Sequence, residues 1–165
     1  MRLNISKLSE GIHKQSLEAQ PDEIGLDARF GEPVRVSATL EKTSRQLFLH
    51  VEIVTAGLFS CDRCLDEFRR EVRNSYTIVY VSDPQAAEGL DEQEVQVIHA
   101  DTNMIDLGED VRQYTLLALP LKILCLEECA GLCPECGMNR NRGTCRCATV
   151  TTDPRWEGLK RFLGN

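Results

Sequence analysis

The spacing of the eight cysteines limits what this chain can fold into more than any other feature of its sequence. The segment from Cys129 to Cys147 alone holds five cysteines within 19 positions. All eight fall into four close pairs, which are Cys61 with Cys64, Cys125 with Cys129, Cys133 with Cys136, and Cys145 with Cys147. Two thiolates that lie two residues apart can bind one tetrahedral ion from a single turn of the chain. Chance burial of free cysteines does not produce four such pairs, so the spacing predicts metal sites.

The redox compartment separates zinc from disulfides as explanations of these pairs. The first 20 residues contain no hydrophobic segment typical of a signal peptide, and no apolar run reaches the roughly 18 residues of a membrane span. We therefore expect a cytoplasmic protein with no membrane partner, in which the thiols stay reduced. A thioredoxin-like pair would need a helix after its second cysteine, but a strand pattern follows Cys64. We expect structural zinc in one or two four-cysteine sites, because four thiolates suit a tetrahedral ion.

Four cysteine pairs can be combined into two four-cysteine sites in three ways. The combination we favour joins the third pair to the fourth, because only the eight residues 137–144 separate them and closing so short a loop costs little entropy. The first and second pairs would then share the other ion. The main alternative joins the first and third pairs, as zinc ribbons do, and leaves the second and fourth pairs together.

Alternating apolar residues predict antiparallel strands on both sides of the first cysteine pair. The apolar side chains occupy every second position in residues 34–40 and 47–53, and Phe59 continues the second series. Beyond Cys64 they return at the even positions of residues 68–80, with gaps. This pattern is typical of a long hairpin with one buried face, and it places Cys61 and Cys64 at the hairpin tip.

Two helices and an acidic loop are predicted outside the strands. Residues 107–118 carry a stripe of core residues (Leu107, Val111, Tyr114 and Ala118), and Asp106 with Glu109 forms a box-like start. Residues 83–94 are acidic and predict an exposed loop. Residues 153–163 predict a C-terminal helix that docks on the body or on a partner. Three residues of that helix are candidate partner contacts, namely Trp156, Lys160 and Arg161.

The charge of the chain is unevenly distributed, and this bears on nucleic acid as a partner. The net charge is −7, yet residues 138–165 hold six Lys and Arg against two acids. A strong, purely electrostatic RNA binder would not be acidic overall. Arg140, Arg142 and Arg146 are candidate RNA contacts, although they could instead only offset the negative charge of a four-thiolate metal site. No P-loop, GxGxxG, GxSxG or HExxH motif is present, so we expect no enzyme and no small-molecule substrate.

Five segments in the same order resemble one bacterial family. They are CDRCLDEF, the acidic insert, IDLGEDVRQYTLLALPL, LCPECGMNRNRGTCRC and DPRWEGLKRFL. Together they are similar to the YceD-like proteins, also called large ribosomal RNA subunit accumulation proteins. The resemblance implies a non-enzymatic ribosome-biogenesis factor that supports the accumulation of 23S ribosomal RNA. Its partner would be ribosomal RNA or a large-subunit ribosomal protein, and structural zinc would be bound by the cysteines.

The sequence therefore predicts a single α+β domain over residues 1–165. Residues 1–124 would form a β-rich body, with a mainly antiparallel sheet that could close into a barrel and with one packed helix. Residues 125–147 would form a cysteine-rich zinc-knuckle lobe, followed by the C-terminal helix. Two other functions stay open: a thiol-based redox or metal-handling protein, and a protein-interaction module that acts through the tail helix.

Overall fold

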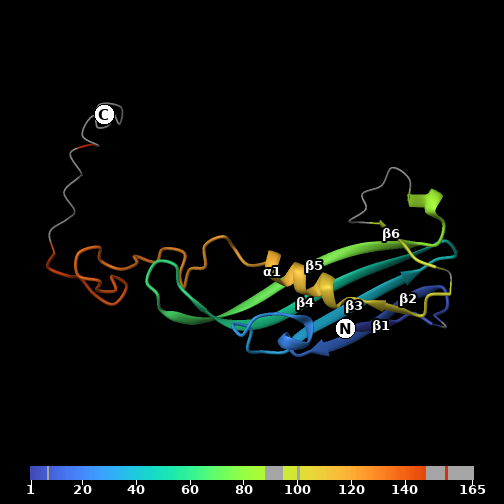
Figure 1. Ribbon diagram of the computed structural model, residues 1–165, viewed down its shortest axis with the longest axis horizontal. Helices are drawn as coiled ribbons and strands as arrows, with labels where there is room; N and C mark the ends of the chain where they lie inside the picture. The colour runs from blue at the N-terminus through green and yellow to red at the C-terminus, as the bar shows by residue number, and fades with distance from the viewer. Residues whose placement is uncertain (7, 88–94, 100, 148–154, 156–165) are drawn as a thin grey trace.

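A five-stranded sheet forms the body of the computed structural model, which describes residues 1–6, 8–87, 95–99, 101–147 and 155 (Figure 1). The strands lie in the order β2 (Gly11–Ala19), β3 (Val34–Lys42), β4 (Gln46–Ser60), β5 (Glu67–Val81) and β6 (Val95–Val97). Neighbours are antiparallel except β5 and β6, which run parallel. The prediction of a mainly antiparallel α+β fold is confirmed.

The hairpin of β4 and β5 is the longest element and carries the first cysteine pair at its tip. Each strand has 15 residues, and the register runs without a break from Gln46 opposite Val81 to Ser60 opposite Glu67. The predicted alternation is confirmed, because odd positions of β4 and even positions of β5 face the core. Those that are fully or nearly fully buried are Leu47, Leu49, Val51, Ile53, Thr55, Phe59, Val72, Tyr76, Ile78 and Tyr80.

The sheet is open, so the barrel-like closure considered from the sequence is wrong. Among the described strands, β2 and β6 form the two edges and no ladder joins them. The edge strand β6 has only three residues, which leaves little backbone that could pair with β2. One face of the sheet is instead covered by α1 (Gly108–Leu117), the 3₁₀ helix η1 (Pro21–Ile24) and the amino-terminal segment (Figure 1).

Helix α1 packs on β5 through the apolar stripe that the sequence predicts. Val111 is fully buried, and the ring of Tyr114 stacks on that of Tyr76 with centroids 4.3 Å apart. The Asn74 side-chain amide donates to the Tyr114 carbonyl oxygen at 2.6 Å, which ties the carboxyl-terminal half of α1 to β5. These contacts fix the helix from which the chain continues to the remaining cysteines.

The predicted capping box at the start of α1 is wrong, because the N-cap is Leu107 and has no side-chain cap hydrogen bond. The Asp106 carboxylate does accept a hydrogen bond, from the Gly108 backbone N–H at 2.9 Å, and it also accepts from the Met1 ammonium at 3.1 Å. The Glu109 side chain does not reach back to the backbone. It accepts instead from Arg112 and Gln113 one turn further on, because guanidinium and amide donors lie within its reach there.

A second, two-stranded sheet of β1 (Arg2–Asn4) and β7 (Met104–Asp106) joins the amino terminus to α1. Neither strand was assigned from the sequence, because three residues are too few to show a period. The predicted acidic loop is described only as far as the 3₁₀ helix η2 (Pro84–Ala87), and the predicted tail helix 153–163 lies outside the described residues apart from Arg155. None of the described helices is long and apolar enough to cross a membrane.

Candidate metal centres

The structure gathers the eight cysteines into two groups of four at the far end of the long hairpin. We call Cys61, Cys64, Cys125 and Cys129 the inner centre, and Cys133, Cys136, Cys145 and Cys147 the outer centre. Within each group all four sulfur atoms lie within 4.8 Å of one another. This grouping is the local combination favoured by loop closure, and the alternative that joins the two CxxC pairs is wrong for this structure.

The distances between the sulfur atoms fit a tetrahedral ion and exclude disulfides. Cys61 Sγ lies 3.7 Å from Cys129 Sγ, Cys64 Sγ lies 3.6 Å from Cys125 Sγ, and Cys133 Sγ lies 3.4 Å from Cys145 Sγ. Four sulfurs bound to zinc at about 2.3 Å would be about 3.8 Å apart, whereas a disulfide bond is about 2.05 Å long. All eight cysteines are free. The donor set and its spacing therefore fit one divalent ion in each centre.

The two CxxC pairs fold into knuckles with the same backbone hydrogen bonds. The N–H that follows the second cysteine donates to the carbonyl oxygen of the first, from Leu65 to Cys61 and from Gly137 to Cys133, at 2.9 Å in both. The N–H of the first cysteine donates to the carbonyl oxygen five residues on, at 2.9 Å for Cys61 and 2.8 Å for Cys133. The shared pattern holds both sulfur atoms of each pair on one side of a tight turn.

This turn requires a positive φ after the second cysteine. Gly137 adopts φ 72° at no steric cost because it has no Cβ. Leu65 adopts φ 61° in the inner knuckle, and there its Cβ is crowded by the backbone. A left-handed conformation costs a residue with a Cβ about 1–2 kcal/mol. The Leu65 side chain is 66% exposed and has little burial to offset that cost. The strain is therefore held by the hydrogen bonds of the knuckle and by the lobe that packs on it.

The second cysteine pair reaches the inner centre because the chain after α1 is bonded to the hairpin tip. Asp62 and Ile123 exchange two hydrogen bonds, from the Asp62 N–H to the Ile123 carbonyl oxygen at 2.8 Å and from the Ile123 N–H to the Asp62 carboxylate at 2.6 Å. The Arg63 guanidinium donates to the Cys129 carbonyl oxygen at 2.9 Å. These bonds lie just before Cys125 and at Cys129, and they close a loop of about 60 residues onto the tip.

A glycine allows the chain to pass close to the hairpin tip between the two centres. Gly131 has φ 68°, and a Cβ at this position would lie 3.0 Å from the Arg63 carbonyl oxygen. That carbonyl accepts the Leu132 N–H at 3.1 Å. A side chain at residue 131 would push the outer centre away from the hairpin.

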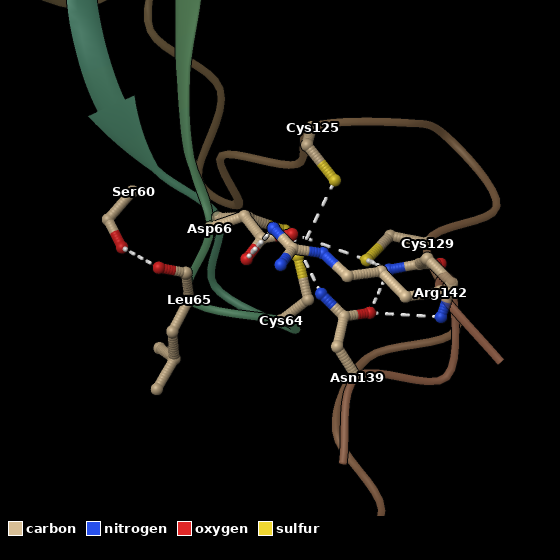
Figure 2. Close-up of polar contacts among 10 residues, drawn as sticks. Ser60, Cys64, Leu65, Asp66, Cys125, Cys129, Asn139 and Arg142 are labelled. Carbon is tan, nitrogen blue, oxygen red and sulfur yellow. Dashed lines mark hydrogen bonds and ion pairs between the residues drawn. The ribbon is translucent and has the colours of Figure 1, made fainter.

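The loop of the outer centre returns to the inner centre through polar side chains (Figure 2). The Asp66 carboxylate accepts from the Asn139 amide at 2.7 Å and forms an ion pair with Arg142 at 3.0 Å. The Asn141 amide nitrogen donates to Cys129 Sγ at 3.1 Å, and its oxygen accepts the Ala130 N–H at 2.7 Å. The 137–144 loop thus contacts both the hairpin and one sulfur of the inner centre.

The pKa of one thiol in each centre is lowered by its surroundings. Burial raises the pKa of Cys61, but backbone N–H donors of Cys125, Cys64 and Arg63 outweigh it and bring the pKa to about 6. Backbone donors of Cys136 and Glu135, with the Cys145 thiol, lower the pKa of Cys133 to about 6. Thiolate is the form that binds a metal ion, so each centre contains a ligand that is ionised at neutral pH.

Another thiol in each centre, Cys125 in the inner one and Cys147 in the outer one, resists ionisation. Burial and then the neighbouring sulfurs raise the pKa of Cys125 to about 12. The Cys136 thiol, followed by burial, raises the pKa of Cys147 to about 12. Four negative charges within a few ångströms repel one another, and a divalent cation removes that repulsion. The arrangement therefore favours coordination of an ion over four free thiolates.

The two centres differ in their access to solvent. Cys61, Cys64 and Cys129 are buried and Cys125 is half-buried, so the inner centre is closed. In the outer centre only Cys133 is buried, whereas Cys136 and Cys147 are exposed. We therefore expect the outer centre to exchange metal and react with oxidants more readily.

The other predicted site residues separate into three cases. Arg142 forms an ion pair with Asp66 at 3.0 Å, although its side chain is 74% exposed. Arg140 and Arg146 are exposed and form no ion pair with any part of the chain that the structure describes. The candidate partner contacts Trp156, Lys160 and Arg161 lie outside the described residues.

Comparison with known proteins gives a family match and several relatives. The family model "Large ribosomal RNA subunit accumulation protein YceD" matches residues 49–163. An uncharacterized protein of Mycobacterium tuberculosis is 28% identical over 149 residues, which is 87% of this chain and 70% of the relative. An uncharacterized protein of Mycobacterium leprae is 26% identical over 117 residues, which is 69% of this chain and 54% of the relative. No solved structure matches the chain significantly.

Proposed function

The chain belongs to the YceD family of large ribosomal RNA subunit accumulation proteins, and we propose on that basis that it is a ribosome-biogenesis factor. In this role it supports the accumulation of 23S ribosomal RNA and catalyses no reaction itself. The observation that carries the proposal is the match over residues 49–163, because it spans most of the long hairpin, α1 and both cysteine centres.

The metal has a structural role in this proposal. Zinc in the inner centre fastens the hairpin tip to the chain that follows α1, and zinc in the outer centre closes the loop that carries the arginines. A rigid loop loses less conformational entropy when it binds a partner than a flexible one does. The ions therefore hold a binding surface in shape and do not act on a substrate.

The partner we favour is ribosomal RNA, contacted by the basic loop of the outer centre. Arg140 in this loop and Arg146 between the last two ligands of the outer centre form no ion pair with any described residue, while Arg142 pairs with Asp66. Two arginines can supply a few phosphate contacts. We therefore expect a modest affinity for RNA, as an acidic chain of net charge −7 would have. Binding of a large-subunit ribosomal protein is the alternative outcome of the same tests.

Deletion of the gene tests this function directly. We expect the ratio of 23S to 16S ribosomal RNA to fall, and expression of the wild-type chain to restore it. A variant with Cys61→Ser and Cys133→Ser should fail to restore the ratio if the folded lobe is required. A 23S-to-16S ratio in the deletion strain equal to that of the wild type would contradict the proposal.

A thiol-based metal-handling role is a second candidate because the outer centre is exposed. Cys136 and Cys147 are open to solvent, whereas the inner centre is closed. A sensor of this kind would release one zinc ion in mild peroxide and rebind it after reduction, and the ribosomal RNA ratio would be unaffected by loss of the gene. Retention of both ions in mild peroxide would exclude this candidate.

A further inference from the structure

One polar contact between the two centres runs from the loop of one centre to a ligand atom of the other. Asn141 lies between the ligands Cys136 and Cys145 of the outer centre in sequence. Its amide nitrogen donates to Cys129 Sγ of the inner centre at 3.1 Å. A group that hydrogen-bonds a metal ligand orients it and tunes its affinity for the ion.

The orientation of the Asn141 amide is fixed by its other bonds. Its oxygen accepts the backbone N–H of Ala130 at 2.7 Å, so only the nitrogen is left to face the sulfur. The same nitrogen also donates to the Asn139 side-chain oxygen at 3.0 Å, and the Asn139 amide donates to Asp66 at 2.7 Å. Asn141 therefore sits in a network in which the other partners hold it against Cys129.

The conformation of this network depends on the outer centre. Asn139, Asn141 and Arg142 all lie in the 137–144 loop, whose two ends are the ligand pairs of the outer centre. One end follows the knuckle bonds of Cys133, and at the other end Cys145 Sγ lies 3.4 Å from Cys133 Sγ. An ion bound to all four thiolates would close the loop and reduce its freedom.

We propose that the two centres bind metal cooperatively, with Asn141 as the residue that couples them. An ion in the outer centre holds Asn141 against Cys129 and so raises the affinity of the inner centre for its ion. An ion in the inner centre fixes the position of Cys129 Sγ, which then holds Asn141 and its loop in place. Coupling between binding sites is reciprocal, so each ion raises the affinity for the other by the same factor. This inference rests on the metal binding included in the proposed function but not on the role in ribosome assembly.

The coupling factor can be measured by zinc titration against a chelator of known affinity. The Cys145→Ser/Cys147→Ser variant gives the affinity of the inner centre alone, and Cys125→Ser/Cys129→Ser gives that of the outer centre alone. The wild-type chain gives the overall constant for two ions. We expect the overall constant to exceed the product of the two single constants by about 10- to 100-fold, which is the usual effect of a residue that supports a metal ligand.

Substitution of Asn141 assigns the coupling to its hydrogen bond. Asn141→Asp preserves the shape of the side chain but removes the N–H donor. The zinc titration is repeated with this substitution alone and with it added to each of the two double variants. We expect the overall constant then to equal the product of the single constants within about twofold. Asn103→Asp, at an exposed position near β7, is the matched control and should leave the coupling unchanged.

The results distinguish this inference from the metal proposal itself. If neither single-centre variant binds zinc while its β4–β5 amides stay protected from hydrogen exchange, metal binding fails and the coupling fails with it. If both centres bind zinc but the wild-type constant equals the product, the coupling alone is wrong. Persistence of the coupling in Asn141→Asp would show that Asn141 does not carry it, which also overturns the inference.

Discussion

Leu65 and Gly137 occupy the same position in the two knuckles and have nearly the same φ, 61° and 72°. Each donates its backbone N–H to the carbonyl oxygen of the first cysteine of its pair at 2.9 Å. The sequence provides a glycine at only one of these two positions. The hairpin tip therefore carries backbone strain that the outer knuckle does not.

Replacement of Leu65 by glycine should stabilise the protein. Glycine removes about 1–2 kcal/mol of left-handed strain and costs about 0.5–1 kcal/mol in the entropy of the unfolded chain. We expect a net gain of up to about 1.5 kcal/mol in the free energy of unfolding, measured by denaturant titration with zinc present. Leu58→Gly is the control, since Leu58 is similarly exposed but lies in the extended β4, where glycine should destabilise. Equal losses in both variants would contradict the strain argument.

Single cysteine substitutions in the two centres should have different structural effects. Cys133→Ser should lose the outer ion and leave β4 and β5 intact, because the contacts that the structure describes between this lobe and the hairpin lie at the hairpin tip. Cys61→Ser should also raise amide hydrogen exchange at the tip, since Cys61 is fully buried and its knuckle joins the two strands. Mass spectrometry of exchange with elemental analysis checks both results. Identical exchange patterns would show that the two centres form a single unit.

The carboxylate of Asp106 should make stability depend on pH. The Gly108 N–H and then the Met1 ammonium lower the pKa of Asp106 below its usual 3.8. A lowered pKa contributes stability above the unfolded value, and this contribution is lost as the pH falls through the folded pKa. Asp106→Asn should therefore be less stable than wild type at pH 7 by about 0.5–1 kcal/mol, and the gap should close below about pH 3.8. Both proteins lose metal over the same acidic range, so their difference reports Asp106, and a gap that does not vary with pH would refute the assignment.

The three arginines of the outer loop should separate into two classes. Arg140→Ala and Arg146→Ala should each lower the salt dependence of binding to a single-stranded 23S RNA fragment by about 0.7 in log–log slope, with no change in stability. Arg142→Ala should instead increase exchange in the loop, because it removes the ion pair with Asp66. Filter binding at several salt concentrations measures the slopes. Unchanged slopes in the Arg140 and Arg146 variants would leave the ribosomal protein as the partner to test.

The long strands and the cysteine grouping were predictable because both follow from short-range patterns. Alternation over residues 34–40, 47–53 and 68–80 predicts one buried face, and that face is buried in the structure. The eight-residue spacing between Cys136 and Cys145 predicts that their pairs meet, because short loops close easily. Strand β2 shows only a weak pattern, since its alternate positions are half-buried at most until Ala19.

The contacts that join the two centres could not be predicted in the same way. Asp66 and Asn139 are 73 residues apart, and neither stands in a motif that marks it as a partner of the other. Asn141 looks like a turn residue in a loop rich in glycine and asparagine, and its bond to Cys129 depends on how the lobe folds onto the hairpin. The openness of the sheet was also missed, because alternation predicts which face is buried but not how the edges end.

Elemental analysis of the protein purified under reducing conditions tests the central claim most directly. The account predicts two zinc ions for each chain, one in each four-cysteine centre, with loss of one ion in Cys133→Ser. A freshly prepared, fully reduced chain that contains no metal and still shows a protected β4–β5 hairpin and an ordered cysteine lobe would contradict it.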